Sequence, residues 1–332
     1  MKKVYLFGAG ASKGSDHQLP VMDEFFHNFP PGKYPSLHQF LERTFPGTKI
    51  PSMNIEDVIT HLELSLEGFG ARWRWVEMDV AKAHRECMDF IHDQLDYPPR
   101  NNNRFCEIHR KILNQCSPDD TFITLNYDLV IDHSLRFRND TRSFFGQNYE
   151  KRLRNIVWGL KFDEEEPIPP AGKREGFFLK LHGSLDWHYC PLESCINHQQ
   201  FFSNELVSMH SADKHMVRPG SPCPVCGTGI VPVIIPPGLG KSFEKYPKMG
   251  ILWNIAFREI EAADELIFIG MSLPPSDYFL RWLLREATNS NQKKRRVTIA
   301  NNSAEAIDRI KKLMGVEKPA LFDSLASFTE RL

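Results

Sequence analysis

The 332-residue sequence lacks a strong net charge, a long hydrophobic run and internal repeats. A formal net charge of −1 argues against the broad positive surface that binds nucleic acid or anionic membranes. No apolar stretch reaches the roughly 20 residues that span a bilayer, and the segment after Lys2 and Lys3 is too short and too glycine-rich for a secretory signal. We therefore expect a cytoplasmic protein that binds neither membranes nor specific nucleic-acid sequences.

Cysteines are few, and their odd number, seven, is not that of a secreted disulfide framework. Four of them form two close pairs separated by a loop, Cys190 with Cys195 and Cys223 with Cys226. Two such pairs can close a tetrahedral thiolate site for Zn²⁺, although the first pair is wider than usual. His188 and His198 are alternative ligands, and two unrelated pairs are the other possibility. A zinc ion held by four cysteines would be structural, and it would hold together a small lobe over residues 188–230.

Short β-rich runs alternate with helical patterns, which is typical of a doubly wound parallel sheet. Six runs are expected as strands: Val4–Phe7, Thr121–Leu125, Phe177–Leu181, Val231–Ile235, Glu265–Ile269 and Val297–Ala300. A helical module over residues 54–116 starts at Asn54, a good N-cap that apolar residues follow at helical spacing. We predict one α/β, Rossmann-like domain over residues 1–332, into which the helical module and a zinc-ribbon-like lobe are inserted.

Small or chemically capable polar residues follow five of the six runs. They are Gly8, Ala9, Gly10 and Ser12 after the first run, Asn126 and Asp128 after the second, His182 after the third, Gly270 and Ser272 after the fifth, and Asn301 after the sixth. Ligands of open α/β sheets bind beyond the carboxyl ends of the strands, so five such ends indicate one ligand crevice. The glycines of the first turn would let the backbone approach a pyrophosphate.

Each feature also has a purely structural interpretation. A tight turn from strand to helix needs glycine even without a phosphate. Asn126 can cap a helix that begins at Tyr127, with Asp128 in its first turn. A lone histidine such as His182 is often a core or surface residue, although its place at a strand end before Gly183 favours a chemical role.

In order and content these motifs resemble the sirtuin superfamily, and more closely its prokaryotic sirtuin-like branch, which includes NAD-hydrolysing antiphage defence proteins. The shared motifs are Gly-Ala-Gly-x-Ser at 8–12, Asn-x-Asp at 126–128, His-Gly at 182–183, the four-cysteine lobe, Gly-x-Ser at 270–272 and the asparagine at 301. They cover residues 4–303 in order. Two motifs of the protein deacylases are absent from this sequence. Residues 13–20 stand where the deacylases have Gly-Ile-Pro-Asp-Phe-Arg, and residues 233–237 stand where they have Phe-Gly-Glu.

The resemblance implies that NAD is the substrate and that its nicotinamide–ribose bond is cleaved to nicotinamide and ADP-ribose. It implies that Asn126 orients the ribose or a water molecule, that His182 is the general base and that Asp128 engages the carboxamide. The implied diphosphate cradle is Gly8, Ala9, Gly10 and Ser12, with Gly270 and Ser272 near the phosphates and Asn301 on the adenosine ribose. Asp277 belongs to a matching motif, and capping of the following helix is the only role that we assign to it.

The resemblance also implies a toxic activity that is held inactive until it is triggered. We expect a homo-oligomer, and a partner protein such as an ATPase is a further means of control. The alternatives are a protein deacylase, an ADP-ribosyltransferase and a non-catalytic module that senses NAD or ADP-ribose.

Overall fold

The computed structural model describes residues 1–66, 79–96, 106–117, 119–136, 176–196, 198, 202–203, 220–235, 247–291 and 293–331. A six-stranded parallel sheet in the order β3-β2-β1-β7-β8-β9 carries the main hydrophobic core. The strands are β1 (Lys3–Phe7), β2 (Thr121–Thr124), β3 (Phe178–Lys180), β7 (Glu265–Ile269), β8 (Arg296–Ala300) and β9 (Ala320–Phe322). The strand order reverses at β1, which pairs in parallel with β2 on one side and β7 on the other.

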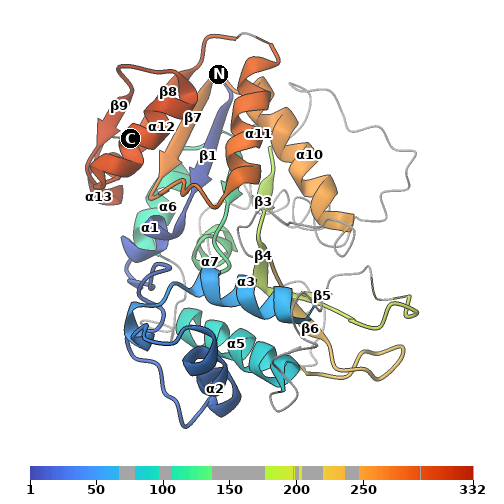
Figure 1. The fold of residues 1–332 in the computed structure, drawn as a ribbon. Helices are drawn as coiled ribbons and strands as arrows, with labels where there is room; N and C mark the ends of the chain where they lie inside the picture. Colours follow the sequence, from blue (N-terminus) through green and yellow to red (C-terminus); the bar gives the residue numbers. More distant parts are fainter. Residues whose placement is uncertain are drawn as a thin grey trace.

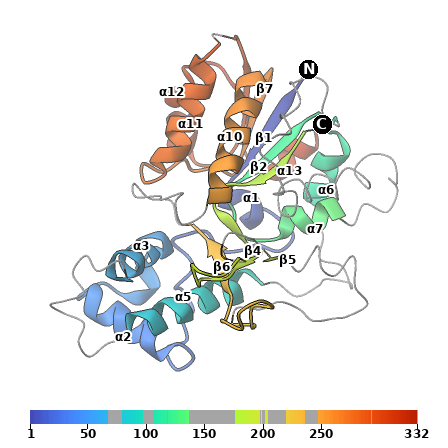
Figure 2. The ribbon, with the colours of Figure 1, turned by 90° about the vertical axis from the view of Figure 1, so that its right-hand side faces the viewer.

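Helices cover both faces of this sheet (Figure 2). One face carries α10 (Pro247–Ala262), α11 (Tyr278–Asn289) and α12 (Ala304–Met314), and the other carries α6 (Glu107–Asn114), α7 (Val130–Arg136) and α13 (Leu325–Thr329). The central strands β1 and β7 are apolar after their first residue because both faces of the sheet are buried there. The predicted doubly wound α/β fold is confirmed. Among the described residues, no helix is both long and apolar enough to cross a membrane.

A second hydrophobic core lies below the sheet in the view of Figure 1. It is built by α2 (Pro35–Thr44), α3 (Ile55–Leu66) and α5 (Val80–Leu95), with the 3₁₀ turn η1 (Ile50–Ser52) leading into α3. The Asn54 side chain accepts a hydrogen bond from the Glu56 amide at 2.8 Å, as an N-cap does. The stretch 54–116 is divided between the two cores: α3 and α5 pack with α2, whereas Ile112 and Leu113 of α6 join the main core.

A smaller antiparallel sheet continues from β3. Its strands are β4 (Gly183–Tyr189), β5 (Phe202–Ser203) and β6 (Val231–Ile234), in the order β5-β4-β6. The expectation that Val231–Ile235 belongs to the parallel sheet is therefore wrong, because β6 pairs with β4. The sixth parallel strand is instead β9, a three-residue edge strand in which two residues are exposed. A short apolar run has the same composition in either kind of sheet, so its pairing is decided only by the chain around it.

Candidate active site and metal centre

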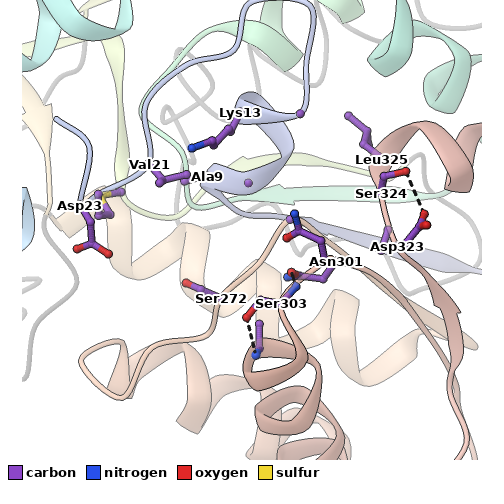
Figure 3. A pocket seen from close by; sticks show the side chains of 17 residues that line it. Ala9, Lys13, Val21, Asp23, Ser272, Asn301, Ser303, Asp323, Ser324 and Leu325 are labelled. Carbon is purple, nitrogen blue, oxygen red and sulfur yellow. Dashed lines mark hydrogen bonds between the residues drawn. The ribbon is translucent and has the colours of Figure 1, made fainter. Parts of the chain in front are cut away.

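A cavity of about 470 Å³ opens at the carboxyl ends of β1, β7 and β8. Figure 3 shows Ala9 and Lys13, from the short helix α1 (Ala9–Lys13), on one side and Ser272, Asn301 and Ser303 on the other. This is where the strand order reverses, which is the usual place for a ligand in an open α/β sheet. The volume lies within the range of small-molecule sites, roughly 300–1,000 Å³. Five of the predicted NAD-binding residues line the cavity: Ala9, Gly10, Gly270, Ser272 and Asn301.

The glycines of the first turn pack against the end of β7. The Gly10 amide donates to the Gly270 carbonyl at 2.8 Å, and a Cβ on Gly270 would lie 2.0 Å from the Ala11 nitrogen. Gly270 also has a φ of +57°, a left-handed conformation that other residues rarely adopt. A Cβ on Gly8 would meet the Met271 Cα at 2.7 Å. The glycines are thus required by the approach of two strand ends, and backbone rather than bulky side chains walls this part of the cavity.

Three predicted residues form one buried hydrogen-bonded cluster. Ser12 Oγ donates to Asp128 Oδ2 at 2.7 Å, and Asn126 Nδ2 donates to Ser12 Oγ at 2.9 Å and to the Gly8 carbonyl at 3.0 Å. Each of these side chains is at most 6% exposed. They lie behind the glycine turn and are not among the residues that line the cavity. The structure therefore ties Asn126 and Asp128 directly to the turn that walls the cavity.

The structural alternative for this segment is correct in part. Asp128 Oδ1 accepts a hydrogen bond from the Val130 amide at 3.0 Å, as a capping carboxylate does. The helix α7 begins at Val130, however, so the expectation that Asn126 caps a helix starting at Tyr127 is wrong. The Asn126 amide is used instead to bind Ser12 and Gly8.

A buried lysine that belongs to none of the sequence motifs supports the same segment. Lys180 is 1% exposed, and its Nζ donates to the Asp128 carbonyl at 2.6 Å and to Asp132 Oδ2 at 2.9 Å. It joins β3 to the Asn126–Asp128 segment and to α7. A cation inside an otherwise apolar strand was the available signal, because lysine is rarely buried unless it is paired.

His182 lies at the corner where β3 passes into β4. Gly183 makes the corner possible, because its φ is +89° and a Cβ there would lie 1.9 Å from the Val233 carbonyl oxygen. The imidazole is 4% exposed and has the rings of Tyr127 and Trp253 near it, each with its centroid at 6.4 Å. Its Nε2 is 3.5 Å from Oδ2 of Asp277.

Hydrogen bonds to the main chain hold the two neighbouring rings. Tyr127 donates its hydroxyl to the Ile235 carbonyl at 3.1 Å, and Trp253 donates Nε1 to the Leu181 carbonyl at 3.1 Å. Burial, together with nearby carboxylates, holds the pKa of Tyr127 well above its usual value of 10.0, so this phenol is neutral. The two rings beside His182 are therefore uncharged and tied to the main chain.

The predicted residues at the strand ends thus fall into three groups in space, and Gly8 is joined to the second of them through its carbonyl. One lines the cavity, and the second is the cluster of Ser12, Asn126 and Asp128 behind the glycine turn. The third is His182 with Asp277. Tyr127 connects the last two groups, since it follows Asn126 in the chain and its ring lies next to His182.

The four cysteines of the two pairs converge. Their Sγ atoms all lie within 4.8 Å of one another, with 3.5 Å between Cys190 and Cys226 and 3.8 Å between Cys195 and Cys223. Zinc–sulfur bonds of about 2.3 Å in a tetrahedron place the sulfur atoms about 3.8 Å apart, so the geometry fits zinc. The alternative ligand His198 instead places Nδ1 2.9 Å from the Cys190 carbonyl. The other alternative, His188, is outside the converging group.

The local chain explains how the second pair is presented. The Cys223 amide donates to the Thr228 carbonyl at 2.8 Å, and the Gly227 amide donates back to the Cys223 carbonyl at 2.9 Å. Gly227 has a φ of +75°, which closes this tight turn. Hydrogen bonding to Thr228 lowers the pKa of the exposed Cys226 thiol, which favours the thiolate that a metal needs. Four cysteine ligands leave no open position, so a zinc ion here would be structural.

The sequence matches no protein-family model, and no curated protein is detectably similar to it. Its structure is similar to solved structures of Sir2 proteins. A Sir2 homologue mutant in complex with ADP-ribose has a TM-score of 0.47 and 16% identity, over 99% of this chain and 89% of that chain. A Sir2 mutant with a peptide and NAD has a TM-score of 0.42 and 14% identity, over 100% and 91%. Sir2Tm bound to a propionylated peptide has a TM-score of 0.41 and 14% identity, also over 100% and 91%.

Proposed function

We propose that this chain is an NAD glycohydrolase, which cleaves the nicotinamide–ribose bond of NAD and releases nicotinamide and ADP-ribose. The observation that carries the proposal is the buried cluster of Ser12, Asn126 and Asp128, which lies directly behind the turn that walls the crevice at the sheet's reversal point. A buried network of this kind is costly unless each member is satisfied, and it holds its side chains in one arrangement. Such rigidity suits a site that must position one bond of a substrate.

The orientation of Asn126 follows from its partners. The Gly8 carbonyl can only accept, so the atom facing it is the amide nitrogen. Both amide hydrogens are then committed, one to Gly8 and one to Ser12. Oδ1 is the atom of Asn126 left to accept a hydrogen bond from a ribose hydroxyl or a water molecule. Asn126 would thus orient the group that reacts.

The proposed reaction is a displacement at C1′ of the nicotinamide ribose. As the glycosidic bond breaks, nicotinamide leaves with the bonding electron pair, and positive charge develops on the sugar. The carboxylate of Asp128 would engage the carboxamide of the leaving group. A water oxygen then bonds to C1′, and His182 takes the proton that the water loses. This balance needs no redox partner, and the zinc-binding lobe would hold the fold rather than act on NAD.

An enzyme with this activity must be controlled, because unrestrained NAD hydrolysis would harm a cell. We propose that the chain is an effector of antiphage defence that acts as a homo-oligomer and is restrained until a trigger arrives, with a partner such as an ATPase as a further control. Light scattering after size-exclusion chromatography, with NAD cleavage measured in each fraction, tests the homo-oligomer. Activity confined to a monomer peak would contradict it.

The main test is chromatographic separation of products after the purified chain is incubated with NAD, with and without an acetyl-lysine peptide. We expect nicotinamide and ADP-ribose without peptide, and loss of both in Asn126→Ala and His182→Ala. Asn254→Ala and His38→Ala are matched controls that should leave cleavage unchanged, because Asn254 is exposed on α10 and His38 lies on α2, outside the candidate site. Turnover only with the peptide would replace the proposal with a protein deacylase. Tight NAD binding without turnover, even at high protein concentration, would leave either a sensor or an enzyme that lacks its trigger.

A further inference from the structure

A buried carboxylate faces the proposed catalytic base. Asp277 is 2% exposed, and its Oδ2 lies 3.5 Å from Nε2 of His182, which is 4% exposed. The two residues come from different elements, His182 from the end of β3 and Asp277 from the start of α11. A separation of 3.5 Å is a charge contact that becomes an ion pair when the imidazole is protonated.

The start of α11 fixes the carboxylate. Asp277 is the N-cap residue, and its Oδ1 accepts a hydrogen bond from the Leu280 amide at 3.4 Å. One carboxylate oxygen thus serves the helix while the other faces His182. The positive end of the helix dipole favours the ionised form of a capping carboxylate. Contacts at both oxygens therefore hold the Asp277 carboxylate in one orientation.

The carboxylate of Asp277 is a charged neighbour of His182, and the two aromatic rings beside the imidazole carry no charge. On the β2 side lies Tyr127, which is neutral, and on the α10 side lies Trp253. Lys180, two residues earlier in the chain, directs its charge to Asp132 of α7. A capping role alone does not require an acid at position 277, since Asn, Ser and Asp cap helices about equally well.

We infer that Asp277 is a positioning residue for His182, whose carboxylate orients the imidazole and stabilises its protonated form as the proton of water is taken up. This inference rests on the proposed function for its role in turnover, but the contact itself does not depend on it. A carboxylate behind a histidine base makes the histidine a stronger base and fixes its ring, without contacting the substrate.

The decisive variant is Asp277→Asn, because asparagine keeps the helix cap and removes only the charge. The matched control is Asp79→Asn, which makes the same change at the N-cap of α5, where Asp79 accepts from the Lys82 amide at 2.8 Å. We expect Asp277→Asn to lower kcat by about tenfold to a hundredfold with KM for NAD changed by less than about twofold. The acid limb of the kcat–pH profile should move about one to three units to lower pH. The control should change none of these quantities.

A second measurement separates this inference from the proposed function. The titration of His182 is followed by NMR of its imidazole signals, identified by their loss in His182→Ala. Asp277→Asn should lower the pKa of His182 by about one to three units, whether or not the chain cleaves NAD. If wild-type protein leaves NAD intact but this shift is found, the proposed function fails and the Asp277–His182 pair stands.

An unchanged His182 titration, or a pH profile that does not differ from that of Asp79→Asn, would overturn the inference and leave Asp277 as a helix cap. Asp277→Ser serves if the asparagine variant does not fold, because serine also caps a helix without a charge. The same shift in the pKa of His182 is expected from the serine variant, and its absence would likewise overturn the inference.

Discussion

Replacing Gly270 with alanine tests whether backbone contact between two strand ends builds the crevice. The new Cβ would lie 2.0 Å from the Ala11 nitrogen and 2.3 Å from the Gly10 carbonyl carbon. Ordinary contact begins at 3.4 Å, so the turn after β1 must move by about 1.4 Å (3.4 − 2.0) or more. Such a movement breaks the hydrogen bond of 2.8 Å from the Gly10 amide to the Gly270 carbonyl.

The expected loss of stability is the sum of three contributions. A left-handed alanine costs about 1–2 kcal/mol, an overpacked contact costs about 1–3 kcal/mol, and the lost hydrogen bond contributes about 1 kcal/mol. The free energy of unfolding should therefore fall by roughly 3–6 kcal/mol. Because Gly10 and Gly270 both line the cavity, KM for NAD should rise in the fraction of protein that stays folded.

Gly315→Ala is the matched control for this substitution. Gly315 has a φ of +63°, close to that of Gly270, but a Cβ there would meet nothing within 4 Å. Gly315→Ala therefore has the same backbone strain as Gly270→Ala and the same effect on the entropy of the unfolded chain, but its Cβ does not clash. Urea unfolding followed by tryptophan fluorescence should show that Gly270→Ala is about 2–4 kcal/mol more destabilising than the control. Equal losses in the two variants would refute the proposed close packing of strand ends.

Three further predictions concern stability and metal content. Lys180→Met should lower the free energy of unfolding by about 3–5 kcal/mol, because it removes the cation that pairs with the buried Asp132. Adding Asp132→Leu should restore most of this loss. A double variant as unstable as the single one would contradict the ion pair. Elemental analysis should find zinc in the wild-type protein and in Cys87→Ser, but not in Cys223→Ser. Cys223 belongs to the four converging thiols and Cys87 does not. Wild-type protein without metal would refute the site. Burial lowers the pKa of His109 to about 4, below its unfolded value of about 6.5. The unfolded chain therefore binds the additional proton between these values, so stability falls as pH drops from about 6.5 to about 4, by roughly 3 kcal/mol in total. His109→Leu should flatten this dependence in urea titrations, and an unchanged slope would exclude His109 as its source.

The sheet was largely predictable because buried parallel strands are continuous apolar runs. The runs at Val4–Phe7, Glu265–Ile269 and Val297–Ala300 leave little choice of conformation, and they form neighbouring strands. Two strand assignments were wrong or missing, each for its own reason. The run at 231–235 is equally apolar but pairs with β4, and the three residues of β9 are too few and too exposed to leave a pattern.

The gathering of candidate residues at one edge was also predictable in outline. Parallel strands place their carboxyl ends together, so Gly10, Gly270 and Asn301 had to lie at the same edge once the strands paired. Their function and that of the other candidate residues remain predictions. What could not be predicted is which neighbour each side chain binds, since these contacts join segments far apart in the chain.

The sequence by itself determined the class of fold, the polar content of the strand ends and the four cysteines able to close on a metal. These properties follow from local patterns of burial, conformation and ligand type. Only the tertiary structure decided that Ser12 binds Asp128, that Lys180 donates a hydrogen bond to the Asp128 carbonyl and that Asp277 faces His182. The reason is physical: a hydrogen bond or ion pair requires two groups within a few ångströms, and packing of α7, α10 and α11 against the sheet sets those distances.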